Sequence, residues 1–180
     1  LIAALLGLPL GLLGARPLGQ PAPVRQGARG LCAALRAVPE LLSALFLVTA
    51  FGFGPPAGIL ALGLHSAGFL GRFYADAIED TNQAPVRALL ASGAERIATF
   101  RFALWPQVRA PFVTSTFYIL DRNVRMAAVV GLVGAGGIGQ ELKGRIDMYE
   151  YAHVGTILAG ILIVVLLLDQ FAARLRRKPL

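Results

Sequence analysis

The stretch LLSALFLVTAFGFGPPAGILALGLHSAGFLG, from Leu41 to Gly71, decides the fold. Its 31 residues carry no charged side chain apart from a titratable histidine, His65. A break at Gly52-Phe53-Gly54-Pro55-Pro56 divides the stretch, because two prolines beside two glycines do not continue a helix. The stretch therefore predicts a hairpin of two apolar helices joined by a tight turn.

The two arms extend beyond this stretch. We expect the first arm to begin near Leu31 and to carry Arg36 and Glu40 four residues apart. We expect the second arm to run from Ala57 toward Asp80. Two such arms in one chain are typical of a membrane protein that spans the bilayer several times.

The composition agrees with a membrane protein. Of the 180 residues, 56% are hydrophobic and only 15% are charged, and the mean hydropathy is +0.66. These values exclude a disordered chain and an ordinary soluble enzyme. A single cysteine, Cys32, also excludes a disulfide scaffold, and we expect it to be a small packing residue.

Three more apolar blocks complete a prediction of about five spans in an all-α transmembrane bundle. The first block, Leu1 to Gly14, would reach only ~21 Å as a helix, so we interpret it as the second half of a truncated span. The fourth runs from Pro106 to about Ile138, and the fifth from about Tyr151 to Leu168, before the basic tail 174–178.

The distribution of basic residues predicts the orientation. If the tail is cytoplasmic, alternation places residues 16–30 and 80–106 inside, and the Pro55-Pro56 turn and residues 126–150 outside. Most of the 17 Lys and Arg residues then lie inside, as the positive-inside rule requires. The positive-inside distribution thus explains the net charge of +7, and we expect no nucleic-acid partner.

One of the inside segments, residues 81–106, contains a short helical pattern. It runs from Pro85 to Ser92 with Gly93 just past its end, which are helix start and stop signals. Two turns cannot span a membrane. The segment is either a helix that projects from the membrane or a loop that lies on lipid headgroups.

The segment Gly134-Ala135-Gly136-Gly137-Ile138-Gly139 matches the dinucleotide fingerprint G-x-G-x-x-G. A true fingerprint needs a βαβ unit, whereas the sequence after Tyr151 is a hydrophobic span. We therefore favour an irregular outer segment in which Gly134, Gly136, Gly137 and Gly139 allow close packing. A membrane-anchored dinucleotide-binding protein remains as an alternative of another class.

Ionisable residues inside the fourth block mark a candidate transport pathway, because charges at membrane depth are costly. Asp121 and Arg125 are four residues apart and can pair with each other. This pairing leaves out Arg122 and also Glu40, which lies in the neighbouring arm. The cluster is either an electropositive wall of an anion pathway or an ion-pair network that joins two helices. The candidate residues are Glu40, Asp121, Arg122, Asn123 and Arg125.

His65 and Cys32 are lone candidates. No second histidine, cysteine or carboxylate stands at ligand spacing from His65, so we expect a hydrogen bond to a neighbouring helix there and no metal site. The sequence offers no nucleophile–base pair and no Walker A loop.

The inside segment also resembles the cytoplasmic loop of ABC importer permeases, E-A-A-x-x-x-G followed nine residues later by I-x-L-P. Ala88, Gly93 and Pro106 fit this spacing, while Arg87 stands in place of the glutamate and Leu89 in place of the second alanine. Four further stretches are similar to the permease subunit of the phosphonate family: 35–41, 64–68, 121–125 and 130–142. The resemblance covers Leu5 to Lys178.

This resemblance implies that residues 1–180 form one permease domain of a type I importer, N-terminally truncated, with residues 81–106 as its coupling loop. The residues implied to couple to an ATPase are Val86, Arg87, Ala88, Leu89, Leu90, Ser92, Gly93, Ala94 and Pro106. The implied partners are ABC ATPase subunits, an extracytoplasmic solute-binding protein and a second permease subunit, in a homodimer.

The implied function is ATP-driven import of a phosphonate or a related oxyanion, such as phosphite or a phosphate ester, across a prokaryotic inner membrane. The chain would not be an enzyme and would hold no cofactor, since ATP would bind the partner subunit. An alternative cargo is another small solute, such as an amino acid or a quaternary amine.

Overall fold

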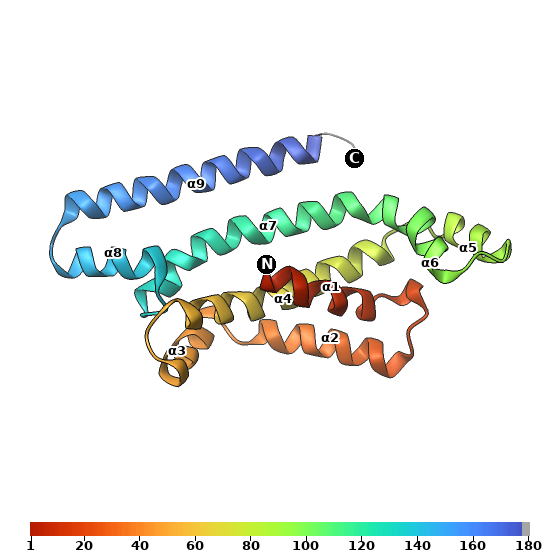
Figure 1. Cartoon of the computed structure of the whole chain (residues 1–180), viewed down its shortest axis with the longest axis horizontal. Helices are drawn as coiled ribbons and strands as arrows, with labels where there is room; N and C mark the ends of the chain where they lie inside the picture. The colour runs from red at the N-terminus through yellow and green to blue at the C-terminus, as the bar shows by residue number, and fades with distance from the viewer. Residues whose placement is uncertain (178–180) are drawn as a thin grey trace.

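The computed structural model describes residues 1–177, without the side chains of Arg96 and residues 175–177, and its regular elements are helices (Figure 1). No strand occurs within this described part, so the all-α prediction is confirmed. The elements are α1 (Ile2–Gly14), η1 (Arg16–Leu18), α2 (Ala22–Ala37), α3 (Glu40–Phe51), α4 (Pro55–Glu79), α5 (Gln83–Ala91), α6 (Arg96–Thr99), the π-helix η2 (Phe100–Leu104), α7 (Trp105–Leu132), α8 (Gly137–Asp147) and α9 (Tyr151–Arg177).

Helix α4 is the centre of the bundle and packs against α1, α2, α3 and α7. Small residues at one-turn spacing let α1 approach it closely: a Cβ added at Gly11 would lie 2.6 Å from Cβ of Tyr74. Leu70 and Ile78 of α4 lie in one core cluster with Val108 of α7, and all three are almost fully buried.

The predicted hairpin is present, but its first arm is not one helix. The Gly52-Phe53-Gly54 turn joins α3 to α4 as expected. However, α2 ends at Ala37 and α3 begins at Glu40, and the two axes differ by 83°. Pro39 explains the break, because a proline disfavours the helical conformation of the residue before it. The expectation that Arg36 and Glu40 lie on one helix is therefore wrong.

Helix α7 is continuous through the charged stretch 121–125 and ends at Leu132. It runs antiparallel to α4, and two side-chain hydrogen bonds join them: Ser66 Oγ to Asn123 Oδ1 at 2.7 Å, and the Tyr74 and Thr116 hydroxyls at 2.7 Å. The expected outside segment 126–150 is thus shorter than predicted, since its first seven residues belong to α7.

By length and apolar composition, one described helix, within α9, can cross a membrane, and the bent pair α2–α3 counts as a second if taken as one span. Helices α4 and α7 have 25 and 28 residues, so each exceeds the ~30 Å of a hydrocarbon core. Neither helix passes the same apolar criterion; α7 carries Asp121, Arg122 and Arg125 within its length, and α4 carries Arg72, Asp76 and Glu79 in its last eight residues.

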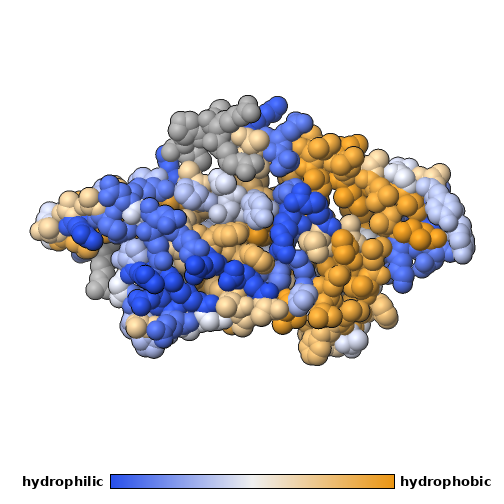
Figure 2. Space-filling model, turned by 180° about the vertical axis from the view of Figure 1, so that it is seen from behind, coloured by the Kyte–Doolittle hydropathy of each residue, from blue (hydrophilic) through white to orange (hydrophobic). Residues whose placement is uncertain are grey.

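The surface divides between the two ends of the bundle. Figure 2 shows hydrophilic residues over the end that carries α5 and α6, and hydrophobic residues toward the end that carries α3. Leu42, Phe46, Phe51 and Phe53 are more than half exposed at that second end. Exposed aromatic and leucine side chains in such number are expected of a surface that faces lipid or another protein.

Candidate functional site

A buried polar cluster lies where α3, α4 and α7 meet. Its members are Glu40 of α3, His65 and Ser66 of α4, and Asp121, Arg122, Asn123 and Arg125 of α7. Glu40, His65 and Asp121 are each less than 9% exposed. The five pathway residues expected from the sequence thus occur in three neighbouring contacts: Glu40 with Arg122 and His65, Ser66 with Asn123, and Asp121 with Arg125.

Arg122 joins Glu40 across the cluster. Its Nη2 donates to Oε1 of Glu40, which is 82 positions away in the sequence. The same Nη2 lies 3.4 Å from Nε2 of His65, so the expected contact of His65 with a neighbouring helix is present. The guanidinium also stands over the ring of Phe69, 4.8 Å from its centroid, a cation–π geometry.

The second ion pair of the cluster lies within α7. Nη2 of Arg125 is 2.6 Å from Oδ2 of Asp121, which confirms the predicted pairing of these residues. The Arg125 side chain is 51% exposed whereas that of Asp121 is buried, so the pair extends from the interior to the surface. The cluster thus holds two carboxylates and two guanidinium groups, in two ion pairs.

Four buried atoms of the cluster have no hydrogen-bond partner in the described part of the chain: Oε2 of Glu40, Nδ1 of His65, Oδ1 of Asp121 and Nη1 of Arg122. Buried polar groups are normally paired, and an unpaired one costs about 1–3 kcal/mol. The cluster therefore has spare hydrogen-bonding capacity for water or for a polar ligand.

Helix α5 is the projecting element of the loop 81–106. The Asn82 side chain caps its first turn by accepting a hydrogen bond from the Ala84 amide at 2.9 Å. The helix thus begins at Gln83, two residues before the predicted start at Pro85. Asparagine is a preferred N-cap, so Asn82 was the local signal for the earlier start.

The end of α5 depends on Gly93. Its φ of +82° lies in the left-handed region, and a Cβ there would meet no atom within 4 Å. The amides of Gly93 and Ala94 donate to the carbonyls of Leu90 and Leu89, both at 3.1 Å, which is a Schellman motif. The glycine is therefore required for its backbone conformation, and not for a close approach.

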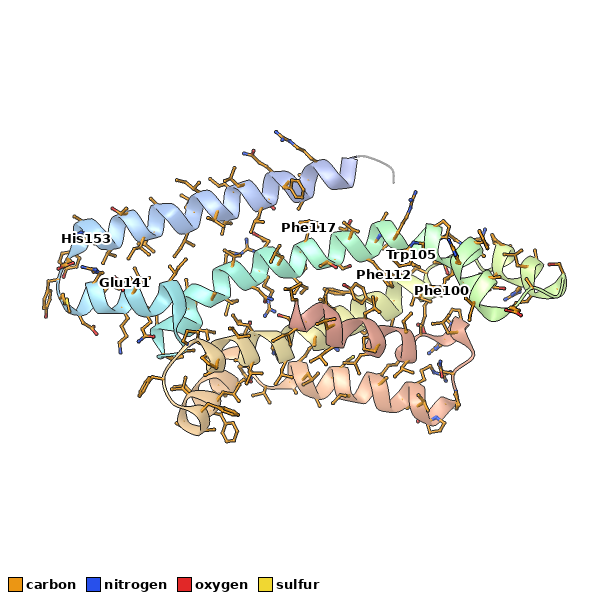
Figure 3. All side chains as sticks on the ribbon, viewed as in Figure 1. Phe100, Trp105, Phe112, Phe117, Glu141 and His153 are labelled. Atoms are coloured by element: carbon orange, nitrogen blue, oxygen red, sulfur yellow. The ribbon has the colours of Figure 1, made fainter. Side chains whose placement is uncertain are left out.

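The loop 81–106 is held at both ends. Gln107 donates to the carbonyl of Asn82 at 3.3 Å and accepts from its amide at 3.1 Å, so one side chain bridges the starts of α5 and α7. Figure 3 shows Phe100, Trp105 and Phe112 gathered where η2 passes into α7. These contacts fasten both ends of the loop to the start of α7. No motif in the sequence singles out Gln107.

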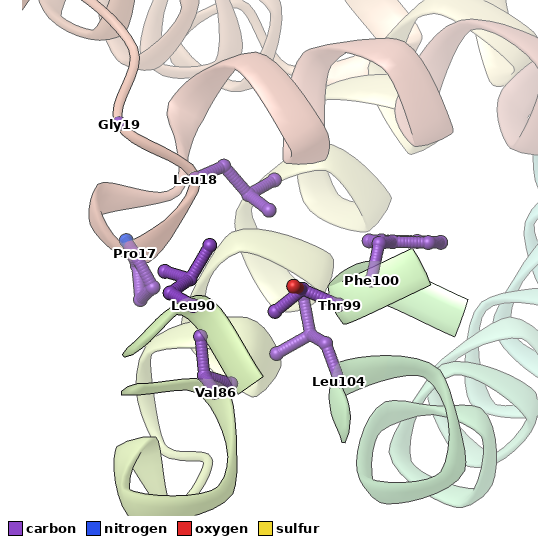
Figure 4. A pocket seen from close by; sticks show the side chains of 8 residues that line it. All are labelled: Pro17, Leu18, Gly19, Val86, Leu90, Thr99, Phe100 and Leu104. Carbon is purple, nitrogen blue, oxygen red and sulfur yellow. The ribbon is translucent and has the colours of Figure 1, made fainter. Parts of the chain in front are cut away.

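A pocket of about 190 Å³ lies between η1, α5 and η2 (Figure 4). Val86 and Leu90 of α5 line one side, and Leu18 of η1 lines another. Nearby, the end of α4 is tied to η1 and α2, because Glu79 accepts from the Arg16 amide at 2.9 Å and pairs with Arg29. Among the predicted coupling residues, Val86 is buried, Leu89 and Ala94 are half-buried, and Arg87, Ala88, Leu90, Ser92, Gly93 and Pro106 are exposed.

The glycine-rich segment lies between α7 and α8, against the α3–α4 turn. Gly134 accepts a hydrogen bond from the Gly54 amide at 3.1 Å, and a Cβ at Gly139 would lie 2.0 Å from the Ala128 carbonyl oxygen. The segment packs closely at Gly134, Gly136 and Gly139, whereas a Cβ at Gly137 would meet no atom within 4 Å, and Gly137 instead has a φ of +72°. A helix precedes it, where a dinucleotide fingerprint needs a strand, so the dinucleotide alternative is wrong.

Ion pairs also fix the turn from α8 to α9. Arg145 donates to Glu141 at 2.8 Å and to Glu150 at 2.7 Å, and Nδ1 of His153 lies 3.3 Å from Glu150 (Figure 3). The hydrogen bond from Arg145 lowers the pKa of Glu150 below its ordinary value. Within the described residues, no group of three or more His, Cys, Asp and Glu side chains could hold a metal ion.

The fold and the projecting loop define the class of protein. The structure is similar to the inward-facing MetNI methionine ABC transporter, with a TM-score of 0.83 and 26% identity, over 99% of this chain and 88% of that one. A crystal structure of an amino acid ABC transporter with histidines shares the fold, with a TM-score of 0.77 and 18% identity, over 98% of this chain and 85% of that one. The fold is that of a type I ABC importer permease.

Residues 7–177 match the model of the family described as the binding-protein-dependent transport system inner membrane component, and the chain belongs to this family. A relative from Stutzerimonas stutzeri, named as a phosphite transport system permease protein, HtxE, is 59% identical over 84% of this chain and 58% of its own length. PtxC, named as a phosphite transport system permease protein of the same organism, is 46% identical over 83% of this chain and 54% of its own length. PhnE of Mycolicibacterium smegmatis, named as a phosphate-import permease protein, is 37% identical over 98% of this chain and 33% of its own length.

The chain spans a third to about three fifths of the length of these three relatives.

Proposed function

We propose that this chain is the transmembrane pathway subunit of an ATP-driven importer for a phosphorus oxyanion such as phosphite. The observation that carries the proposal is the 59% identity, over 84% of the chain, with a protein named for phosphite transport. Two further relatives named for phosphite and phosphate agree in the class of cargo. Tetrahedral oxyanions suit guanidinium groups, and Arg122 and Arg125 lie at the polar cluster.

The proposed topology has five spans: α1, the bent pair α2–α3, α4, α7 and α9. The loop with α5 and α6 lies on the cytoplasmic side, and α8 lies outside. Arg122 is then 17 residues beyond the start of α7, or ~26 Å along its axis. An arginine at that depth needs a partner, which Glu40 supplies.

In the proposed complex, α5 docks on an ABC ATPase subunit, which binds and hydrolyses ATP. A second copy of the permease completes the pathway as a homodimer, and a solute-binding protein delivers the oxyanion from outside. The support for the docking site is geometric: α5 is capped at both ends, and Gln107 bridges it to α7.

A second candidate cargo is an amino acid, which the likeness to the methionine transporter favours. Measurement of ATP hydrolysis by the reconstituted complex separates the two cargoes. We expect the phosphite-loaded binding protein to stimulate hydrolysis several-fold over the unloaded protein. Stimulation by an amino acid, with no response to phosphite, phosphate or a phosphonate, would overturn the oxyanion assignment.

A further inference from the structure

The contact between Glu40 and Arg122 has an unusual geometry for an arginine–carboxylate pair. Arginine and carboxylate groups frequently pair through two parallel hydrogen bonds. Here a single hydrogen bond joins Nη2 to Oε1, while Nη1 of Arg122 and Oε2 of Glu40 are buried without a partner in the described chain. The guanidinium therefore offers a second donor that its own carboxylate does not use.

The location of Glu40 allows the pair to separate. Glu40 is the first residue of α3 and directly follows the break at Pro39, where the chain turns by 83°. Arg122, in contrast, lies within the continuous helix α7, and its guanidinium also contacts the ring of Phe69 on α4, 4.8 Å from the ring centroid. A small rotation of α3 at Pro39 would move the carboxylate while the guanidinium stays in place.

We propose that Glu40 is a built-in competitor for the transported anion: it occupies Arg122 when the pathway is empty and yields it to the oxyanion. The inference rests on the proposed function and adds the regulation of its site. An oxyanion with three oxygens can use Nη1 and Nη2 together, whereas Glu40 uses Nη2 alone. The exchange keeps the Arg122 guanidinium neutralised throughout, and the displaced Glu40 carboxylate must take a proton or reach water as α3 rotates, because an unpaired buried charge is costly.

The same exchange explains how a pathway binds an anion without retaining it. A free arginine in a buried site would hold a doubly charged oxyanion tightly and release it slowly. Glu40 competes for the guanidinium and returns to it as the anion leaves. This mechanism predicts that removing the competitor tightens anion binding and slows transport, which is the opposite of losing a structural ion pair.

The test compares wild type with Glu40→Gln in the full-length permease, with its ATPase and binding protein reconstituted in proteoliposomes and phosphite as the probe. We expect both KM and kcat of uptake to fall, and calorimetry on the purified permease to show phosphite bound about tenfold more tightly, the equivalent of one charge-assisted hydrogen bond. Glu40→Gln with Arg122→Gln should abolish that binding.

Glu79→Gln is the matched control, because it also removes a carboxylate paired with arginine, at the other end of α4. It should leave phosphite affinity unchanged. If Glu40→Gln folds poorly, phosphite should raise its thermal midpoint more than that of wild type. Unchanged or weaker phosphite binding by Glu40→Gln, or no added stabilisation, would overturn the inference.

Failure of the inference is distinguishable from failure of the proposed function. A wild-type complex that imports no phosphorus oxyanion would contradict the function, while calorimetry would still report whether Arg122 takes an anion once Glu40 is neutral. Normal phosphite uptake by wild type, with Glu40→Gln indistinguishable from it, would contradict the competitor alone.

Discussion

Gly93, at the end of α5, allows a perturbation whose size follows from the structure. A side chain at this position meets no atom within 4 Å, so the full cost of Gly93→Val is conformational. A residue other than glycine pays about 1–2 kcal/mol to hold a left-handed backbone, and a β-branched residue lies at the upper end or above. That cost corresponds to a roughly 5- to 30-fold shift of the conformational equilibrium away from the Schellman motif that ends α5.

If α5 is the docking element, this shift should appear in the affinity for the ATPase. We expect Gly93→Val to weaken the binding of the purified ATPase about 5- to 30-fold, or to uncouple hydrolysis from uptake, with normal membrane insertion. Gly93→Asn should stay close to wild type, because asparagine tolerates this conformation. The control is Gly27→Val on α2, which also faces open space but has no positive φ. Equal ATPase affinity in Gly93→Val and Gly27→Val would refute the reasoning.

Three further predictions concern topology, charge and pH. In a cysteine-free background, Ser92→Cys should react with impermeant thiol reagents only from the cytoplasmic side and Asp147→Cys only from outside; the reverse labelling would overturn the orientation. Asp121→Asn combined with Arg125→Gln should insert and assemble yet transport little, while Arg125→Lys should retain partial uptake; full uptake by the double variant, at wild-type expression, would leave the pair a structural role only. Because the pKa of Glu150 is lowered in the folded chain, its stabilising effect is present above its ordinary pKa and is lost as the pH falls through the lowered pKa. Glu150→Gln should therefore lower the thermal midpoint at neutral pH and not in strong acid, and an equal difference at both would contradict the ion-pair assignment.

The sequence predicts those features that depend on residues close together in the chain. The hairpin turn at Gly52–Pro56 and the end of α5 at Gly93 both follow from residues that cannot continue a helix. The pairing of Asp121 with Arg125 also follows from spacing along one helix. The break before α3 is not predicted, although Pro39 is visible in the sequence. The apolar residues that follow Pro39 favour one continuous helix.

Contacts between distant segments could not be predicted in the same way. Glu40 and Arg122 are 82 positions apart, and whether they meet depends on the rotation of α3 and α7 about their axes. His65 carries no neighbouring ligand in sequence, so its part in the polar cluster appears only after α4 packs against α7. Gln107 likewise gains its role from the return of the chain beside Asn82.

The most direct test of the account is uptake of radiolabelled phosphite by the full-length permease, reconstituted with its ATPase and binding protein. We predict accumulation that requires ATP on the side of α5, requires the binding protein on the opposite side, and is not reduced by excess methionine or a quaternary amine. Uptake that persists without ATP, or transport of methionine with none of phosphite, would contradict the assignment of this chain as the pathway of a phosphorus-oxyanion importer.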